Sequence, residues 1–434
     1  MNDIPMKDSR VRTRAAMSAV LLESTLHAVF HEHLPADLFL KRHFQSDHRI
    51  GGRDRRLYSE LIFSVLRCLG SLRNSFEKRE NYTAFYLAGA AAAGRIDDPA
   101  AGCFLEYAGL DPAVLPSLLA SETPLARLNA FLRLTGSPEC TEQDLFPRWI
   151  FPRLDFVPDA AFFEAHQNRA PLWLRVQRGS TEKVRESLLN DRVETLPHEF
   201  AGNALRVLTP RVNLQSAEAY RKGWVEVQDL SSQCIGLACA PEAGEYWWDA
   251  CAGGGGKTLQ LAAMMNGRGT VFASDVRSAK LNELKRRAAL AGFSNIRTSG
   301  WDGHSLPEGL AGHCAGVLVD APCTSSGRWR RNPESRWTLE EEKLAEISAA
   351  QLDILNHASS AVRSGGVLVY ATCSMFRDEN RAVVEKFLSE HPDFQPESFP
   401  HPLSGVPVPG FLQILHSDGD CDASFFARFR KKGV

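Results

Sequence analysis

The sequence predicts an α/β protein with a doubly wound, mostly parallel sheet in its C-terminal half, preceded by a helical region and a small α+β module. Two patterns predict this arrangement. From about residue 223 onward, strand-like and helix-like segments alternate, which is typical of a parallel sheet with helices on both faces. Before residue 126, apolar residues recur with the 3.6-residue period of helices. We therefore expect three domains, at 1–125, 126–222 and 223–434.

Two apolar stripes with helical spacing predict the helical region. They are formed by Ala19, Leu22, Leu26, Val29 and Phe30, and by Leu57, Leu61, Val65 and Cys68. Basic residues gather beside these stripes, namely Lys41, Arg42, Arg49, Arg53, Arg55, Arg56 and Arg67, with Asp47, Asp54 and Glu60 among them. Two interpretations stay open: a solvated helix face, or a surface patch that binds phosphate groups.

The middle segment, 126–222, differs in pattern from both of its neighbours. Phe-Pro-Arg sequences at 146–148 and 151–153 interrupt helices, because proline removes a backbone donor and clashes with the preceding turn. Strands are predicted at 171–177 and 204–208, with a short helix at 181–189 between them. This mixture indicates a small α+β module.

The alternating elements of the last segment are short strands, each followed by a helix. The predicted strands lie at 246–249, 270–274, 317–319 and 366–372, and the predicted helices at 257–265, 278–291, 341–362 and 378–389. Three of the strands run directly into a chemically active side chain, which is Asp275, Asp320 or Cys373.

Composition excludes several classes of protein. Among the 434 residues, 50 Lys and Arg balance 52 Asp and Glu, so any basic surface must be local. No run of about 18 apolar residues exists, which argues against a transmembrane helix, and we expect no signal peptide. The ten cysteines include no CxxC pair, so we expect no metal site, reduced thiols and a cytoplasmic protein.

A glycine-rich turn joins the first of these strands to its helix, with the sequence Cys-Ala-Gly-Gly-Gly-Gly-Lys at 251–257. A P-loop needs glycine where Cys251 stands, and a dinucleotide fingerprint that starts at Gly253 needs glycine where Thr258 stands. A looser nucleoside-binding turn remains, and it requires an acidic residue at the end of the next strand. Asp275 meets that requirement. The missing pyrophosphate fingerprint favours S-adenosylmethionine as the cofactor.

Asp302 follows a further strand of the alternating series, between the predicted strands at 270–274 and 317–319, within Trp-Asp-Gly at 301–303. It is either a further contact to the cofactor or an ordinary turn aspartate, and both interpretations stay open.

Two cysteines follow strands at the edge where doubly wound sheets bind their ligands. They are Cys323, in Asp-Ala-Pro-Cys, and Cys373, in Ala-Thr-Cys-Ser. A thiolate that adds to carbon 6 of cytosine turns carbon 5 into a nucleophile for the methyl sulfonium. A carboxyl group near ring nitrogen 3, such as that of Asp320, stabilises the charge that develops. Two cysteines and an aspartate are therefore the groups that pyrimidine methylation at carbon 5 needs.

With these motifs in order, the sequence resembles the Sun (RsmB-type) family of RNA cytosine-5 methyltransferases. The resemblance rests on the turn at 251–257, Asp-Ala-Pro-Cys-Thr at 320–324, Arg-Arg-Asn-Pro-Glu-Ser-Arg-Trp at 330–337, and Thr-Cys-Ser at 372–374 followed by Glu379 and Asn380. It covers 223–434 and implies a Rossmann-like methyltransferase domain. We expect the 330–337 segment to form a loop that faces the substrate.

The resemblance also implies roles for individual residues. Cys373 would attack carbon 6, Cys323 would assist release of the product, and Asp320 would contact the target cytosine. S-adenosylmethionine would be bound by Cys251, Ala252, Gly253, Gly254, Gly255, Gly256, Lys257, Asp275, Asp302 and Asp320. A DNA enzyme of related chemistry is disfavoured, because Thr324 follows Cys323 and a Thr-Cys motif is present.

This sequence departs from the family pattern at several positions. Gly253 and Gly254 replace the usual alanine and proline, which predicts a looser turn and weaker cofactor binding. Ala315 stands where the family has aspartate, and Ser325 where it has glycine or alanine. Each residue with an expected chemical role is nevertheless present.

The upstream segments carry a softer resemblance. The 126–222 module is similar to the family's small RNA-recognition-like module, and 1–125 to the NusB-like helical domain of bacterial members, through Arg-Asp-Arg-Arg at 53–56. The implied partner is RNA, most simply 16S ribosomal RNA, with transfer RNA as the alternative. We expect a monomer that binds no membrane. A second hypothesis is an RNA-binding ribosome-assembly factor with weak catalytic activity.

Overall fold

The structure is a computed structural model, and it describes residues 4–75, 82–210 and 212–433. The chain divides into two compact units. The helical unit comprises 1–152, 156–169 and 329–341, and the sheet unit comprises 153–155, 170–328 and 342–434. No helix within the described residues is long and apolar enough to cross a membrane.

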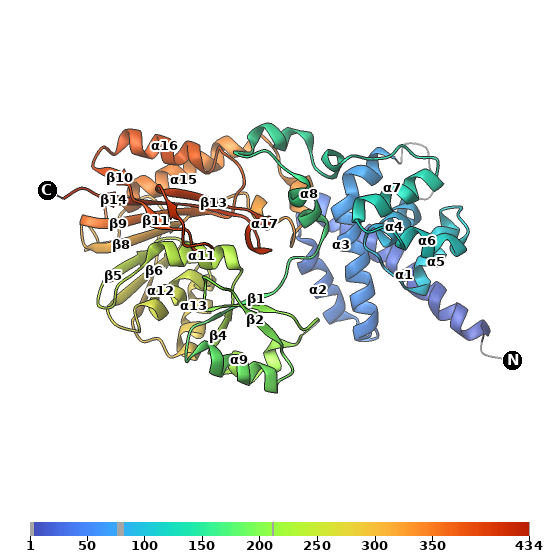
Figure 1. The fold of residues 1–434 in the computed structure, drawn as a ribbon, viewed down its shortest axis with the longest axis horizontal. Coiled ribbons are helices and arrows are strands. Elements are labelled where there is room, and N and C mark those ends of the chain that lie inside the picture. The colour runs from blue at the N-terminus through green and yellow to red at the C-terminus, as the bar shows by residue number, and fades with distance from the viewer. Residues whose placement is uncertain (1–3, 76–81, 211, 434) are drawn as a thin grey trace. The chain divides into compact units, whose positions relative to one another are not determined.

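The helical unit packs around one buried helix (Figure 1). This helix, α4 (Tyr82–Ala93), is rich in alanine and buried on all sides, so its neighbours approach it closely. They are α1 (Ile4–His31), α3 (Gly52–Asn74), α5 (Pro99–Tyr107), α6 (Leu115–Leu119) and α7 (Pro124–Leu134), while α2 (Ala36–Ser46) packs against α1 and α8 (Ala160–Gln167) against α3. Arg127, buried on α7, donates hydrogen bonds to the carbonyl oxygens of Ala92 and Ala93, which satisfies the open C-terminus of α4.

The expected boundary at residue 125 does not match the helical unit, because it falls inside α7. Leu128, Phe131 and Leu132 of that helix belong to the same apolar core as α3 and α4. The unit therefore continues to residue 169, and it takes up residues 329–341 as well. A helix that buries one face in a core cannot be divided between two domains.

Within the sheet unit, the small module is a four-stranded antiparallel sheet with strand order β2-β3-β1-β4. Its strands are β1 (Trp173–Val176), β2 (Thr195–Pro197), β3 (Ala204–Val207) and β4 (Val225–Val227). Helix α9 (Thr181–Asn190) covers one face, where Leu174, Val184 and Leu188 share a core. The expected boundary at 222 falls before β4, which pairs with β1, so the module extends to Val227.

The main sheet has eight strands in the described part of the chain, ordered β10-β14-β9-β8-β5-β6-β7 with β13 beside β14. Its parallel strands are β5 (Tyr246–Asp249), β6 (Thr270–Asp275), β7 (Ile296–Gly300), β8 (Cys314–Asp320) and β9 (Val362–Thr372). Strands β10 (Phe394–Pro396), β13 (Phe411–Ile414) and β14 (Ser424–Lys431) extend it with antiparallel pairing. A small hairpin, β11 (Phe399–Pro400) with β12 (Pro407–Val408), lies apart from it.

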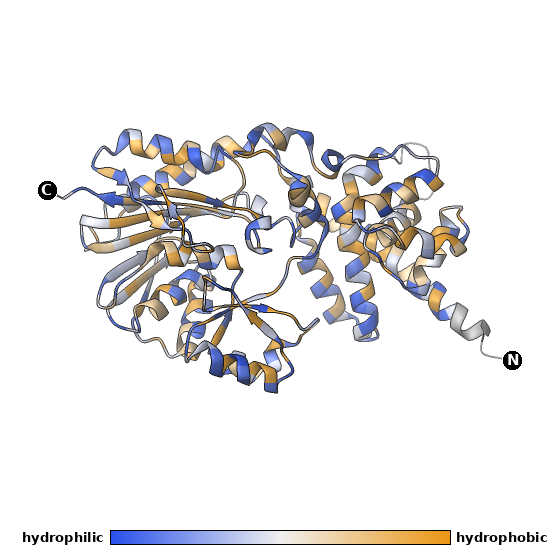
Figure 2. Ribbon diagram, in the orientation of Figure 1, coloured by the Kyte–Doolittle hydropathy of each residue, from blue (hydrophilic) through white to orange (hydrophobic). Residues whose placement is uncertain are grey.

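Helices cover both faces of the main sheet, as the alternating pattern predicts. Helices α11 (Leu230–Cys239), α12 (Gly256–Met264) and α13 (Ser278–Ala291) pack on one face, and α15 (Lys343–Ser359) and α16 (Arg381–Glu390) on the other. Figure 2 shows apolar residues along the central strands, while the helices display both apolar and polar sides. Consecutive residues of a strand point to opposite faces of the sheet, so Trp247 packs against the layer of α11 and α12, and Trp248 against the layer of α15 and α16.

Candidate active site

The carboxyl ends of the parallel strands bring the predicted site residues to one edge of the sheet. Strands β5, β6, β8 and β9 pair in parallel and end at Asp249, Asp275, Asp320 and Thr372, with Cys373 next in the chain. Because β8 and β9 are neighbours, the loops that carry Cys323 and Cys373 begin side by side.

The two cysteine sulfur atoms lie 3.3 Å apart and both side chains are partly exposed. A hydrogen bond from the Cys323 thiol lowers the pKa of Cys373, and a second contact, 3.4 Å to Ser325 Oγ, acts in the same direction. The same hydrogen bond, together with burial, raises the pKa of Cys323 well above its usual value. Of the pair, Cys373 is the sulfur that ionises more readily.

A buried carboxylate holds the two cysteine loops together. Glu379 accepts hydrogen bonds from the backbone N–H of Thr324 at 2.8 Å and from its Oγ1 at 2.6 Å, immediately after Cys323. It also accepts from Ser374 Oγ, immediately after Cys373, and from Gln351 Nε2 at 2.9 Å. Glu379 is fully buried, so these protein donors take the place of the water molecules that would solvate an exposed carboxylate. In the sequence, Glu379 stood out only as part of the motif shared with the Sun family, and no role was predicted for it.

Asn380 extends the same arrangement by one residue. Its Oδ1 accepts a hydrogen bond of 2.6 Å from Thr372 Oγ1, and its Nδ2 donates to the carbonyl oxygen of Ser374 at 2.9 Å. The peptide that carries Cys373 is thereby held on both sides.

Asp320 connects the cysteine loops to the glycine-rich turn. Its Oδ2 lies 2.7 Å from Nζ of Lys257, the residue that ends the turn. Burial alone would lower the pKa of Lys257, but the charge and hydrogen bond of Asp320 outweigh burial and raise it. Asp320 remains partly exposed, so the ion pair presents a carboxylate oxygen beside the cysteines.

The glycine-rich turn has a backbone that few other residues adopt. Gly253 and Gly255 have φ of +53° and +88°, and a Cβ on Gly255 would stand 2.1 Å from Leu284 Cδ1. A Cβ on Gly256 would meet no atom within 4 Å, which leaves room for a ligand against the start of α12. Ala252 packs beside the α12–α13 core, and burial raises the pKa of the Cys251 thiol, which disfavours its thiolate form.

Asp275 closes the other side of the turn. Burial opposes its ionisation, but hydrogen bonds from Arg277 and from the Gly253 N–H at 2.9 Å prevail and lower its pKa. Arg277 binds both carboxylate oxygens, at 2.9 and 3.1 Å. A ribose diol at this aspartate would therefore share the carboxylate with Arg277, a contact that the sequence alone does not reveal.

Asp302 lies in an exposed turn after β7. The backbone N–H of His304 donates to its Oδ1 at 3.0 Å and lowers its pKa. This is turn geometry, and the carboxylate remains open to solvent. The described residues contain no group of three or more His, Cys, Asp or Glu that could hold a metal ion.

Residues 330–337 belong to the helical unit, and Arg330, Pro333, Glu334 and Arg336 of this segment are buried. That the segment faces the substrate stays a prediction. Arg336 is fully buried, donates to the carbonyl oxygen of Arg67 at 3.1 Å and lies over the ring of Phe146 at 4.6 Å. Trp337 Nε1 donates to the carbonyl oxygen of Leu66 at 3.0 Å. Packing within the helical unit thus provides a backbone acceptor for Arg336 at Arg67, and another for Arg330 at the carbonyl oxygen of Arg169.

Comparison with known proteins gives a consistent result. Residues 236–430 match the family model described as 16S rRNA methyltransferase RsmB/F. The chain is 29% identical over 414 residues to the ribosomal RNA small subunit methyltransferase B of Salmonella newport, covering 88% of this chain and 92% of that protein. It is 31% identical over 296 residues to the enzyme of the same name from Yersinia pseudotuberculosis, covering 66% and 67%.

The fold has a counterpart among solved structures. That of the protein PH0851 superposes with a TM-score of 0.72 at 24% identity, and it covers 96% of this chain and 99% of its own. At this level of identity the likeness concerns the fold.

Proposed function

This chain belongs to the RsmB/F family of methyltransferases, and from that premise we propose that it methylates carbon 5 of a cytosine in ribosomal RNA of the small subunit. S-adenosylmethionine is its cofactor. The observation that carries the proposal is the pair of sulfur atoms of Cys323 and Cys373, 3.3 Å apart beside Asp320 at the ligand-binding edge of the sheet. Methylation of an amino group needs no thiol, whereas carbon 5 of cytosine needs one.

The residues at this edge fit a nucleoside-type cofactor. The space at Gly256 is open, and the carboxylates of Asp275 and Asp302 follow the two neighbouring strands. We assign cofactor binding to the turn at 251–257 and to Asp275, Asp302 and Asp320. When bound, the sulfonium supplies an electrophilic methyl group.

The covalent sequence begins at Cys373, whose thiolate adds to carbon 6 of the cytosine and forms a carbon–sulfur bond. Electron density moves toward ring nitrogen 3, where the ammonium group of Lys257, held by Asp320, stabilises it, and carbon 5 becomes an enamine carbon that takes the methyl group. Loss of the carbon 5 proton to a base then expels the Cys373 thiolate and restores the ring. The Cys323 thiol, in hydrogen-bond contact with that sulfur, stabilises the thiolate as it leaves.

The proposed substrate is RNA because the named relatives are ribosomal RNA enzymes. A target base must leave its stack to reach two cysteines at the edge of a sheet, so an unpaired or partly opened region is the expected target. Lys41, Arg42 and Arg56 of the helical unit are exposed and suit phosphate contacts. By contrast, Arg49 pairs with Asp47, so the basic patch is smaller than its sequence suggests.

A second candidate function is an RNA-binding assembly factor with weak catalysis. The observation that favours it is the Arg277–Asp275 pair, which competes with a cofactor ribose for the same carboxylate.

The deciding experiment is methyl transfer from labelled S-adenosylmethionine to total RNA from a strain that lacks this gene, followed by nucleoside analysis. We expect label in 5-methylcytosine within small-subunit RNA, and none with the Cys373→Ala variant or with DNA of the same sequence. Label in another nucleoside would contradict the proposed reaction. A folded protein that binds RNA and transfers no methyl group would favour the second candidate.

A further inference from the structure

Two arginines hold the backbone of the glycine-rich turn through its carbonyl oxygens. Arg287 of α13 donates from Nη1 to the carbonyl oxygen of Gly254. Arg175 of β1 donates from Nη2 to the carbonyl oxygen of Gly256 at 3.3 Å. The turn is thus gripped at two points by side chains that lie outside it in the sequence.

Both arginines are connected to the small antiparallel sheet. Arg175 lies on β1 directly opposite Glu226 on β4, so the two side chains share one face of that sheet. Glu226 in turn makes a two-pronged ion pair with Arg287, at 3.1 and 3.2 Å. The exposed fractions are 17% for the Arg287 side chain and 12% for that of Glu226, so water screens this pair only weakly.

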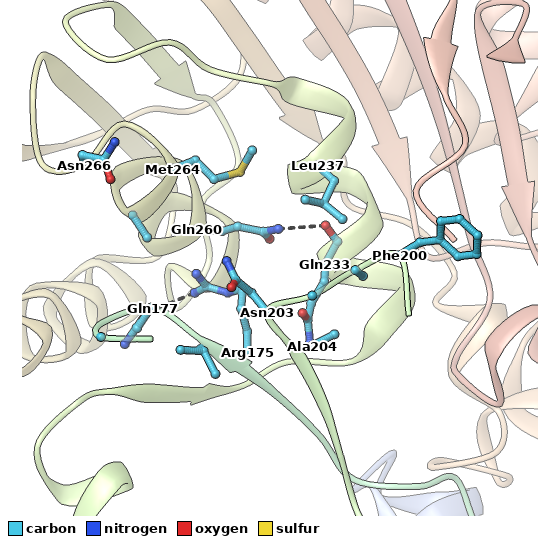
Figure 3. A pocket seen from close by; sticks show the side chains of 15 residues that line it. Arg175, Gln177, Phe200, Asn203, Ala204, Gln233, Leu237, Gln260, Met264 and Asn266 are labelled. Atoms are coloured by element: carbon cyan, nitrogen blue, oxygen red, sulfur yellow. Dashed lines mark hydrogen bonds between the residues drawn. The ribbon is translucent and has the colours of Figure 1, made fainter. Parts of the chain in front are cut away.

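Arg175 is almost completely buried, which is costly for a guanidinium unless its donors are satisfied. Besides the turn, it donates to Gln228 Oε1 at 2.6 Å and to Gln177 Oε1 at 3.1 Å. Figure 3 shows the hydrogen bond from Arg175 to Gln177. Gln228 donates in turn to Gln260 Oε1 of α12 at 3.1 Å, and Gln260 donates to the carbonyl oxygen of Gln233. The face of the small sheet that carries Arg175 is therefore linked by hydrogen bonds to the glycine-rich turn and to α12.

Arg287 also occupies the volume beside the turn. A Cβ on Gly254 would lie 3.1 Å from Arg287 Nη1. Four consecutive glycines have a large backbone entropy, so a turn of this composition needs outside contacts to keep one shape. The arginine provides that contact where a side chain at 254 would otherwise stand.

We propose that Arg175, Glu226 and Arg287 form a clamp through which the small sheet fixes the glycine-rich turn in the shape that binds S-adenosylmethionine. These are positioning residues, because they act on the cofactor through the turn. The clamp rests on the proposed function only in taking S-adenosylmethionine as the ligand of the turn. It does not depend on which nucleotide is methylated.

The test is equilibrium binding of S-adenosylmethionine to the full-length protein by calorimetry. We expect Arg287→Ala to weaken binding about tenfold or more, and Glu226→Gln to weaken it less. The matched control is Arg286→Ala, which removes the same charge from an exposed position of the same helix. In methyl transfer, KM for the cofactor should rise in Arg287→Ala, while kcat at saturating cofactor should stay near that of the wild type. A residue that only stabilised the fold would not separate KM from kcat in this way.

A double variant sharpens the test. In the Arg287→Ala background only the end of the flexible Glu283 side chain stays close to a Cβ at 254, at 3.2 Å, so Gly254→Ala should fit, stiffen the turn and recover part of the lost affinity. In the wild-type background the same change crowds Arg287 and should bring no gain. If Arg287→Ala does not fold, Arg287→Lys and Glu226→Gln carry the measurement.

Cofactor binding by Arg287→Ala equal to that of Arg286→Ala would overturn the clamp. Tight cofactor binding by the wild type without any 5-methylcytosine would overturn the proposed reaction and leave the clamp standing.

Discussion

The sulfur atoms of Cys323 and Cys373 lie 3.3 Å apart, although 50 residues separate them in the chain. The parallel pairing of β8 with β9 causes this contact, since Asp320 stands opposite Ala371 and each loop departs from there. The two thiols have different properties, because Cys373 ionises more readily while Cys323 stays protonated and donates a hydrogen bond to it.

The roles of the two cysteines predict opposite defects. Cys373→Ala should lower methyl transfer at least about a thousandfold, because the covalent step is lost. Cys323→Ala should retain attack but impair release, so a covalent RNA–protein adduct accumulates. Denaturing electrophoresis with labelled RNA detects that adduct. Normal turnover without adduct in Cys323→Ala would refute the assignment of Cys323 to product release.

The hydrogen bond between the cysteines predicts how the reactivity of Cys373 depends on pH. Its removal in Cys323→Ala should raise the pKa of Cys373, so that a higher pH is needed to form the thiolate. At neutral pH, alkylation of Cys373 by iodoacetamide should then slow by about tenfold for each unit by which the pKa rises. Mass spectrometry of the modified peptide measures the rate at each pH. Ser325→Ala should give a shift of the same sign, whereas an unchanged profile in both variants would contradict this account.

The buried Glu379 predicts a large loss of stability from a small chemical change. Glutamine has one acceptor oxygen, whereas Glu379 accepts from Thr324, Ser374 and Gln351 on both of its oxygens. Glu379→Gln should therefore lower the free energy of unfolding by about 2–4 kcal/mol and reduce kcat, because the two cysteine loops lose their common anchor. Urea denaturation and single-turnover assays measure the two effects. Glu385→Gln, at a half-exposed position on the adjoining helix, is the control and should change neither.

Asp249 predicts a pH dependence of folding stability. Burial raises its pKa from 3.8 to about 7, and its hydrogen bond from Thr258 only partly offsets this. Between about pH 4 and 7 the unfolded chain loses this proton and the folded chain keeps it. Stability therefore falls as pH rises through that window, by up to about 4 kcal/mol. Asp249→Asn should abolish this contribution, so unfolding temperatures at pH 5 and pH 8 should differ less than in the wild type. An equal difference in both proteins would show that Asp249 ionises normally.

Substitution of Arg336 can distinguish a structural role of the 330–337 segment from a role in binding the substrate. Arg336 is buried, so its replacement by alanine should destabilise the helical unit by about 2–3 kcal/mol. The change removes the hydrogen bond to Arg67 and the contact with Phe146. Methionine of similar length should be tolerated better. RNA affinity of the folded variants, measured by filter binding, should stay unchanged. A selective loss of RNA binding with normal stability would support the substrate-facing interpretation.

The alternating half of the chain was the part that sequence could predict best. The strand at 246–249 and the helix at 278–291 have the bounds that periodicity predicts, because each carries its signal within itself. Strands β10, β13 and β14 were not predicted, since β14 pairs with β9 through residues more than fifty positions apart, and β10 and β13 pair in turn with β14. The antiparallel extension is therefore visible only in three dimensions.

The same distinction between local and long-range signals applies to the residues of the site. Asp275, Asp320, Cys323 and Cys373 could be proposed because strand ends and motif spacing are local features. The network around Glu379 and the arginines at the glycine-rich turn could not, because each joins segments that only the fold brings together. Likewise, the sequence did not show that Trp173 and Ala204 of the small sheet are buried with α11, which covers the face of the sheet that carries them.

The excursion of residues 329–341 into the helical unit has a consequence for synthesis on the ribosome. Trp329 and Arg336 complete the interior of a unit whose other parts end at residue 169. During translation, that unit must wait with an unfilled interior until residue 341 has left the exit tunnel. The nascent chain therefore has an interval in which a chaperone can bind it, and truncations placed before that point should aggregate rather than yield a free-standing N-terminal domain.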